Sequence, residues 1–162
     1  TIDLTDPRVQ NELPPFDRPR LWSEGPNVPV TFGTGTAGVG GVAPRASVVQ
    51  PAYLGNPTYT LGVDQCAPGA FAMLVFDLAA NSSPANVLGH AVWLAQSGAM
   101  TAVAGQGPTL GAGPGGGFGS FVFAIPTDPG LRGLSLFGQW LIADPAGPQG
   151  FSSSNAFGLT VF

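Results

Sequence analysis

The sequence predicts an all-β fold, an antiparallel β-sandwich of jelly-roll-like character with eight or nine strands and an extended N-terminal arm. Three observations lead to this prediction. The 162 residues include 25 Gly and 17 Pro, which indicate many turns. Short apolar or alternating segments lie between these turns at nearly regular spacing. No amphipathic helix of note interrupts them, so the pattern favours short strands throughout.

Three strands are predicted most directly. In residues 58–64, Tyr59, Leu61 and Val63 alternate with less apolar residues, which is typical of a half-buried strand. Residues 71–78 (F-A-M-L-V-F-D-L) form a nearly continuous apolar run that predicts a central strand. Residues 134–143 are expected to form the longest strand. The other strands are predicted at residues 28–32, 46–50, 91–94, 101–103, 119–125 and 156–162.

Loops are expected where Gly, Pro, Asn, Asp and Ser gather. The strongest turn signal is Pro-Thr-Asp-Pro-Gly at residues 126–130. The other expected loops are residues 33–41, 81–86, 107–117 and 145–154.

Charge divides the chain into an arm, residues 1–26, and a β-sandwich domain, residues 27–162. Residues 1–25 hold eight of the fourteen charged residues. Prolines at five positions of the arm prevent a continuous helix. The arm cannot order itself, so we expect it to dock on its own body or on a neighbouring subunit. Its apolar residues are the predicted subunit interface: Ile2, Leu4, Val9, Leu13, Phe16, Leu21 and Trp22.

Composition excludes several classes of function. The net charge of −4 and the absence of lysine argue against nucleic-acid binding. No apolar run is long enough to predict a membrane span. The chain begins at Thr1, as expected of a processed, exported protein, so an extracellular or cell-surface location is predicted.

No catalytic constellation stands out, and the chain is not predicted to be an enzyme. Gly33, Gly35 and Gly38 match a dinucleotide-binding fingerprint, but glycines and a proline follow where a helix must begin. His90 and Cys66 are the only histidine and the only cysteine, so the common zinc ligand sets cannot form. We therefore predict no catalytic, cofactor-binding or metal-binding residues. His90 is expected to be a structural hydrogen-bonding residue and Cys66 a buried free thiol.

Aromatic residues offer one alternative. Carbohydrate binding needs exposed aromatic side chains on one face, and Trp22, Trp93 and Trp140 are the tryptophan candidates. Because Trp93 and Trp140 lie within apolar strands, the sequence favours a core role for both.

Three stretches of the chain are similar to a recurrent module. F-G-T-G-T-A-G-V-G-G-V-A-P from Phe32 resembles Y-G-x-G-C-x-G-x-G-G-x-x-P. The stretch P-T-D-P-G-L-R-G-L-S-L-F-G-Q-W-L-I-A-D from Pro126 resembles P-x-D-P-x-L-x-G-x-x-L-Y-x-Q-x-x-x-x-D, and the final S-N-A-F-G-L-T-V-F resembles an S-N-G-L ending. This module is the C-terminal β-sandwich domain of secreted or surface proteins of planctomycetes and myxobacteria, and the resemblance covers residues 30–162. It implies a β-sandwich at a secreted or surface location and no activity. Thr36 stands where the module often has cysteine, so the bridge of its relatives is not expected here.

Two hypotheses of function follow from these features. The first is a structural subunit of an extracellular filament or surface assembly, a homopolymer built head-to-tail by docking of the arm on a neighbouring body. The second is a secreted adhesion or binding module for carbohydrate or protein, with surface glycans as candidate partners.

Overall fold

The computed structural model describes residues 28–98, 101–103 and 108–162, with the backbone alone described for residues 101–103. Within these ranges every named pair of strands is antiparallel. The helical segments of the described residues are three short 3₁₀ turns: η2 (Val39–Gly41), η3 (Pro129–Leu131) and η4 (Pro148–Gly150). The predicted fold class, an all-β antiparallel sandwich, is confirmed.

The larger sheet contains the longest strands of the described chain. Its order is β1-β11-β10-β4-β7. The strands are β1 (Val30–Phe32), β11 (Phe151–Thr160), β10 (Ser135–Ala143), β4 (Ala72–Asp77) and β7 (Thr101–Val103). The apolar run predicted to be a central strand is β4. It has a strand on each side, β10 and β7, so the predicted central position is confirmed.

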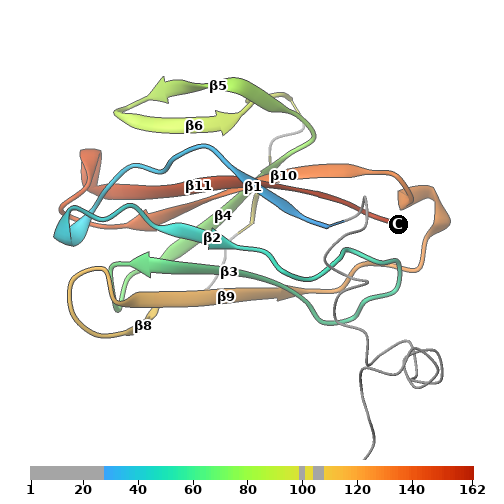
Figure 1. Ribbon diagram of the computed structural model, residues 1–162, viewed down its shortest axis with the longest axis horizontal. Coiled ribbons are helices and arrows are strands. Elements are labelled where there is room, and N and C mark those ends of the chain that lie inside the picture. Colours follow the sequence, from blue (N-terminus) through green and yellow to red (C-terminus); the bar gives the residue numbers. More distant parts are fainter. Residues whose placement is uncertain (1–27, 99–100, 104–107) are drawn as a thin grey trace, which may run out of the picture.

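A four-stranded sheet packs against one face of this sheet, and a hairpin covers the other face, which gives three layers (Figure 1). The four-stranded sheet has the order β2-β3-β9-β8. Its strands are β2 (Arg45–Ser47), β3 (Tyr59–Cys66), β9 (Gly117–Phe123) and β8 (Leu110–Gly111). The hairpin pairs β5 (Ala80–Val87) with β6 (His90–Leu94).

The hydrophobic core lies between the five-stranded and four-stranded sheets. Alternate residues of β3, β4 and β9 point into it, as the period of two in a strand requires. An edge-to-face aromatic contact links the two sheets, since Phe76 of β4 lies 6.1 Å from Phe123 of β9 between ring centroids. Phe76 also lies 6.0 Å from Phe157 of β11 within its own sheet. The largest fully buried side chains of the core are Trp140, Tyr59, Phe157, Leu61, Leu74 and Ile142.

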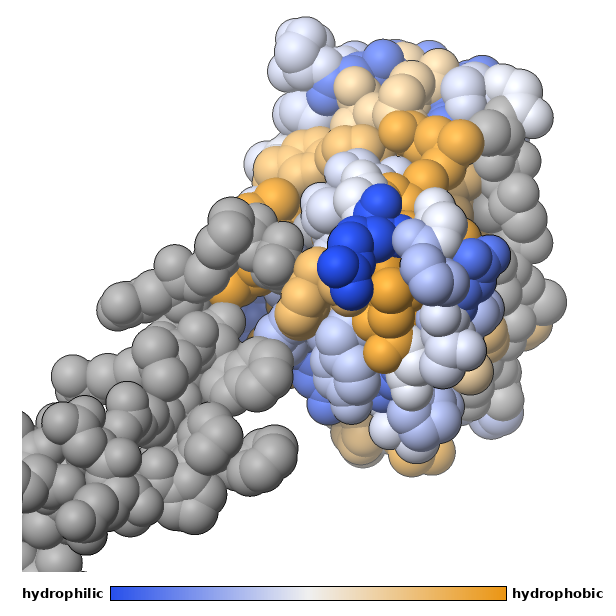
Figure 2. All heavy atoms as spheres, turned by 90° about the vertical axis from the view of Figure 1, so that its right-hand side faces the viewer, coloured by the Kyte–Doolittle hydropathy of each residue, from blue (hydrophilic) through white to orange (hydrophobic). Residues whose placement is uncertain are grey.

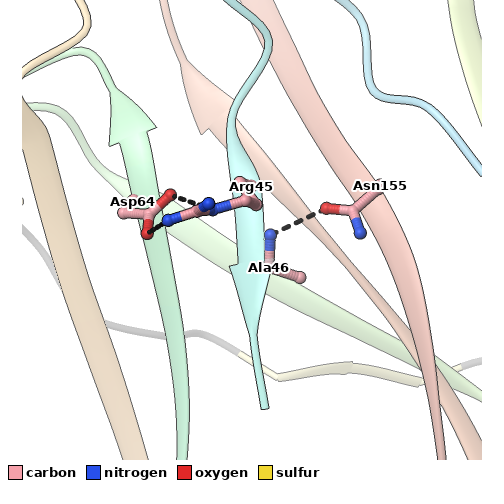
Figure 3. Close-up of polar contacts among 4 residues, drawn as sticks. All are labelled: Arg45, Ala46, Asp64 and Asn155. Atoms are coloured by element: carbon pink, nitrogen blue, oxygen red, sulfur yellow. Dashed lines mark hydrogen bonds and ion pairs between the residues drawn. The ribbon is translucent and has the colours of Figure 1, made fainter. Parts of the chain in front are cut away.

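A β-bulge in β11 allows a contact between the two sheets along one side of the sandwich. The register between β10 and β11 shifts between Gln139 and Leu141, which places Ser154 and Asn155 opposite Trp140. The side chain of Asn155, in the bulge, accepts a hydrogen bond from the Ala46 amide of β2 at 2.9 Å, so it joins the two sheets (Figure 3). An ion pair between Arg45 of β2 and Asp64 of β3 lies beside this contact, with 2.7 Å between Arg45 Nη2 and Asp64 Oδ2 (Figure 3).

The structure corrects four details of the sequence prediction. Residues 81–86, expected to be a loop, belong to β5. Residues 151–154, expected to be a loop, begin β11, which makes β11 and not residues 134–143 the longest strand. The glycine-rich residues 107–117 contain β8. Residues 81–86 and 110–111 are mostly exposed, and Ser152, Ser153 and Ser154 are buried but polar, so no apolar pattern marks these strands.

The close approach of the glycine-rich segment to β11 gives a first prediction. A Cβ atom added at Gly35 would lie 2.1 Å from the Ser153 carbonyl oxygen, too close for any backbone to tolerate. Gly35→Ala is expected to lower the free energy of unfolding by roughly 1–3 kcal/mol. Gly98→Ala is the control, because no atom of the described residues lies within 4 Å of its added Cβ. Urea unfolding checks both variants, and equal losses would contradict the packing described.

Buried ionisable groups give a second prediction. Burial raises the pKa of Cys66 to about 11 and that of Tyr59 to about 12. The unfolded groups ionise at their ordinary pKa values of 9.0 and 10.0. The neutral forms of the two groups therefore contribute fully to the free energy of unfolding below the unfolded pKa values. This contribution is lost as pH rises through the folded pKa values, by roughly 1.4 kcal/mol for each unit of pKa difference between the folded and unfolded states. Unfolding measured between pH 8 and 12 should show this loss, and Tyr59→Phe and Cys66→Ala should each reduce it.

Candidate functional site

The predicted interface residues of the arm, Ile2, Leu4, Val9, Leu13, Phe16, Leu21 and Trp22, lie outside the described residues. The structure therefore bears on the other half of the predicted contact, the sheet edge that receives an added strand. Such an edge needs unpaired backbone groups over several residues and pockets for alternate side chains.

Among the edges of the two packed sheets, β9 has the longest stretch without a second strand partner in the described part of the chain. On one side, β9 pairs with β3 from Tyr59 to Cys66. On the other side, its pairing with β8 includes only Gly117 and Phe118. Residues 119–123 therefore have a strand partner on one side only among the described residues.

Apart from Ser120 on the outward face, the side chains of β9 are apolar on both faces of the sheet. Phe118 and Val122 point outward and are 51% and 50% exposed. Phe121 and Phe123 point toward the core but stay half-buried, stacked on each other at 6.0 Å between ring centroids. Proteins usually protect an open edge with charges, prolines or bulges, and residues 119–123 (G-S-F-V-F) contain neither a charge nor a proline. This open β9 edge, residues 119–123, is the candidate strand-accepting site.

The other edges of the two sheets are less suitable. β1 has only three residues and lies at the edge of the larger sheet beside β11. β2 also has three residues, and the Asn155 side chain already occupies the Ala46 amide. β5 of the hairpin has a longer edge with a partner on one side only, but β5 is polar and contains Pro84, a residue that protects an edge.

The second notable feature is the way in which the β5–β6 hairpin is attached to the larger sheet. Gln139 of β10 substitutes for a strand partner: its Nε2 donates to the Ala91 carbonyl at 2.8 Å, and its Oε1 accepts from the Trp93 amide at 3.1 Å. Thr36 Oγ1 accepts from the Ala91 amide at 3.0 Å. His90 Nε2 lies 3.0 Å from the Pro148 carbonyl oxygen. Side-chain hydrogen bonds thus hold the hairpin above the sheet.

A cavity of about 250 Å³ remains between the hairpin and the sheet. It is open to solvent on one side. Its lining is mainly apolar and comes from both layers: Met73, Val75, Val87, Val92, Leu94, Gln96, Gln139 and Leu141.

The glycines that match the dinucleotide fingerprint have a packing role here. A Cβ atom at Gly33 would lie 2.2 Å from the Trp93 ring, and one at Gly38 would lie 1.8 Å from Asp144 Oδ2. The segment instead lies against β11 and donates from the Val39 amide to Asp144 at 2.8 Å. η2 (Val39–Gly41) follows, with only three residues. The glycines are needed for close approach to protein atoms.

The single-residue predictions have clear outcomes. His90 is buried and hydrogen-bonded, as expected, and Cys66 is a buried free thiol. Trp140 is fully buried in the core, as predicted. Trp93 is only partly buried, and its indole Nε1 donates to the Thr34 carbonyl at 2.8 Å, so it fastens the hairpin instead of filling the core.

Asp77 is a buried carboxylate at the end of β4. Burial alone raises the pKa of Asp77, but hydrogen bonds from the Ser97 hydroxyl and amide and from the amides of Ala79 and Leu78 outweigh it, so the pKa lies below its usual value. The carboxylate therefore stays ionised and holds the chain after β6 against the end of β4. This arrangement is structural.

No protein-family model, curated protein or solved structure matches this chain. The resemblance to the planctomycete and myxobacterial module stays a prediction. Within the described ranges, no group of three His, Cys, Asp or Glu side chains could hold a metal ion. No helix there has the length and apolar character that a membrane crossing needs.

The role of Gln139 gives a third prediction. Gln139→Met keeps the length of the side chain but leaves the Ala91 carbonyl and the Trp93 amide without their partner, which is expected to cost roughly 1–3 kcal/mol. Amide hydrogen exchange at Trp93 should accelerate more than exchange at Leu61 in the core. Gln96→Met is the control, since Gln96 is exposed and should leave both rates unchanged. Equal protection of Trp93 in the two variants would contradict the role assigned to Gln139.

Proposed function

We propose that this chain is a structural subunit of an extracellular filament or surface assembly, in which the arm of one subunit adds as a strand to the open β9 edge of the next. The observation that carries the proposal is the apolar, uncharged edge at residues 119–123. The proposed extracellular location is supported by the resemblance of residues 30–162 to the secreted module.

The arm and the edge are complementary in pattern. Residues 1–6 precede the first proline, so they can pair along their whole length. Ile2 and Leu4 would lie on one face of an added strand and Asp3 and Thr5 on the other. The apolar face suits the half-buried Phe121 and Phe123, and the polar face suits solvent.

The arm is long enough to reach another subunit. Its 26 residues span up to about 85 Å when extended. A body of this size has a radius of gyration of about 14 Å. The arm and the β9 edge are different surfaces of one chain, so a contact between two copies leaves one arm and one edge free. Such a heterologous contact produces an open polymer when its rotation does not close a ring.

The surface charge of the body also favours self-association. The described residues contain six charged side chains, and two of them, Asp77 and Asp144, are buried. The remaining four, Arg45, Asp64, Asp128 and Arg132, have a net charge of zero. Figure 2 shows apolar side chains interleaved with hydrophilic ones on one end of the molecule. A surface with almost no net charge offers little repulsion between copies.

The fourth prediction tests the arm. Deletion of residues 1–25 should convert polymers to monomers, because the β9 edge then has no strand to receive. Ile2→Ser with Leu4→Ser should weaken polymerisation, whereas the matched pair Asp3→Ser with Thr5→Ser should leave it intact, since those side chains face solvent. Light scattering after size exclusion, together with electron microscopy, measures both.

Circular dichroism of each variant controls for folding. Normal polymers from the folded deletion variant would refute the role of the arm. If the full chain is a monomer that binds glycans or a partner protein, the adhesion hypothesis replaces the proposal.

A further inference from the structure

We propose that the cavity beneath the β5–β6 hairpin binds a small amphiphile, a short alkyl chain with a neutral polar head group. This site lies between the hairpin and the outer face of the larger sheet, so it is separate from the β9 edge and does not depend on polymerisation.

The walls of the cavity are held apart by hydrogen bonds. Gln139 reaches from the sheet to the Ala91 carbonyl and the Trp93 amide of β6, so the length of its side chain sets the separation of the two layers. Thr36 and the Trp93 indole fix the hairpin from the side of the glycine-rich segment. Because these bonds must break before the hairpin can settle onto the sheet, the cavity is preformed, as ligand sites usually are.

The apolar side chains that line the cavity favour a ligand with an alkyl chain. Met73, Val75 and Leu141 form the floor, and Val92 and Leu94 belong to the hairpin. Gln139 has no hydrogen left to donate to a ligand, because Nε2 already donates to the Ala91 and Ser154 carbonyls. The volume of about 250 Å³ exceeds the roughly 150 Å³ of an apolar cavity that holds one benzene molecule.

The open side of the cavity offers one polar contact. Gln96 belongs to the lining and is exposed, and its side-chain amide has no hydrogen-bond partner among the described residues. Its backbone adopts a φ of 55°, a left-handed conformation that costs energy in a residue other than glycine. Such strain is found most often at functional sites. The lining contains no charged residue, so the Gln96 amide is suited to a hydroxyl or amide head group and not to an ion.

The methionines provide a direct measurement, since the chain contains only Met73 and Met100. The full chain is labelled with ¹³C at the methionine methyl groups and titrated with 1-octanol, and Met73→Leu assigns the signals. The Met73 methyl should shift saturably with 1-octanol and much less with sodium octanoate, whose head group is charged. Gln96→Ala should weaken binding of 1-octanol about two- to tenfold, the range for one hydrogen bond.

Variants that fill the cavity complete the test. Leu141→Trp and Val92→Phe occupy the space from opposite layers and should each abolish the Met73 shift, whereas Leu88→Phe in the exposed hairpin turn should retain it. Two filling variants are used so that misfolding of one leaves the other informative. A Met73 signal that never saturates, or that shifts equally in the folded filling variants, would overturn the proposal. Octanol binding that needs deletion of residues 1–27 would also overturn it, because the arm would then be the occupant.

Discussion

The contact between the glycine-rich segment and the C-terminal strands determines how the rest of the molecule is arranged. Gly35 and Gly38 bring the backbone so close to β11 and Asp144 that a Cβ atom at either position would overlap with them. Thr36 and Ser153 exchange backbone hydrogen bonds of 2.8 and 3.1 Å at this point. Because the segment lies here, Thr34 and Thr36 are in reach of β6 and fasten the hairpin. The glycine-rich stretch and the stretch that ends at Asp144, both of which resemble the secreted module, meet where the Val39 amide donates to Asp144, although 105 residues separate the two.

This contact explains why the larger sheet is a middle layer. β4 has an almost continuous apolar sequence because Leu74 faces the core while Met73 and Val75 face the cavity beneath the hairpin. The hairpin itself is held by polar groups, chiefly Gln139, and its outer strand β5 is exposed along most of its length. The layer is thus fixed in place without close apolar packing, which leaves the cavity. The same molecule combines a tightly packed core on one face of the sheet with a preformed hollow on the other.

The sequence predicts the parts of the fold in which apolar residues follow the period of a strand. The alternation of Tyr59, Leu61 and Val63 identifies β3, and all three side chains are buried. β5 (A-N-S-S-P-A-N-V) could not be found in this way, because it is polar, contains a proline and depends on hydrogen bonds to β6. The open β9 edge could not be found either, since it results from a β8 strand that has only two residues. Charge and prolines identify the arm in the sequence. The β9 edge that is proposed to accept it depends on pairing between distant segments, which no local sequence pattern reveals.

The central claim is that the arm of one copy adds to the β9 edge of another. Cross-linking between two single-cysteine chains tests it most directly, in a Cys66→Ala background. One chain has Asp3→Cys and the other Ser120→Cys, an exposed position on β9, because both side chains would lie on the outward face of the sheet. Added strands bring opposing residues within reach of a disulfide. Mixed and oxidised assemblies should give a disulfide between the two chains with Ser120→Cys and little with Ser47→Cys on β2. Equal cross-linking at the two positions, or none at Ser120→Cys in intact polymers, would contradict the account.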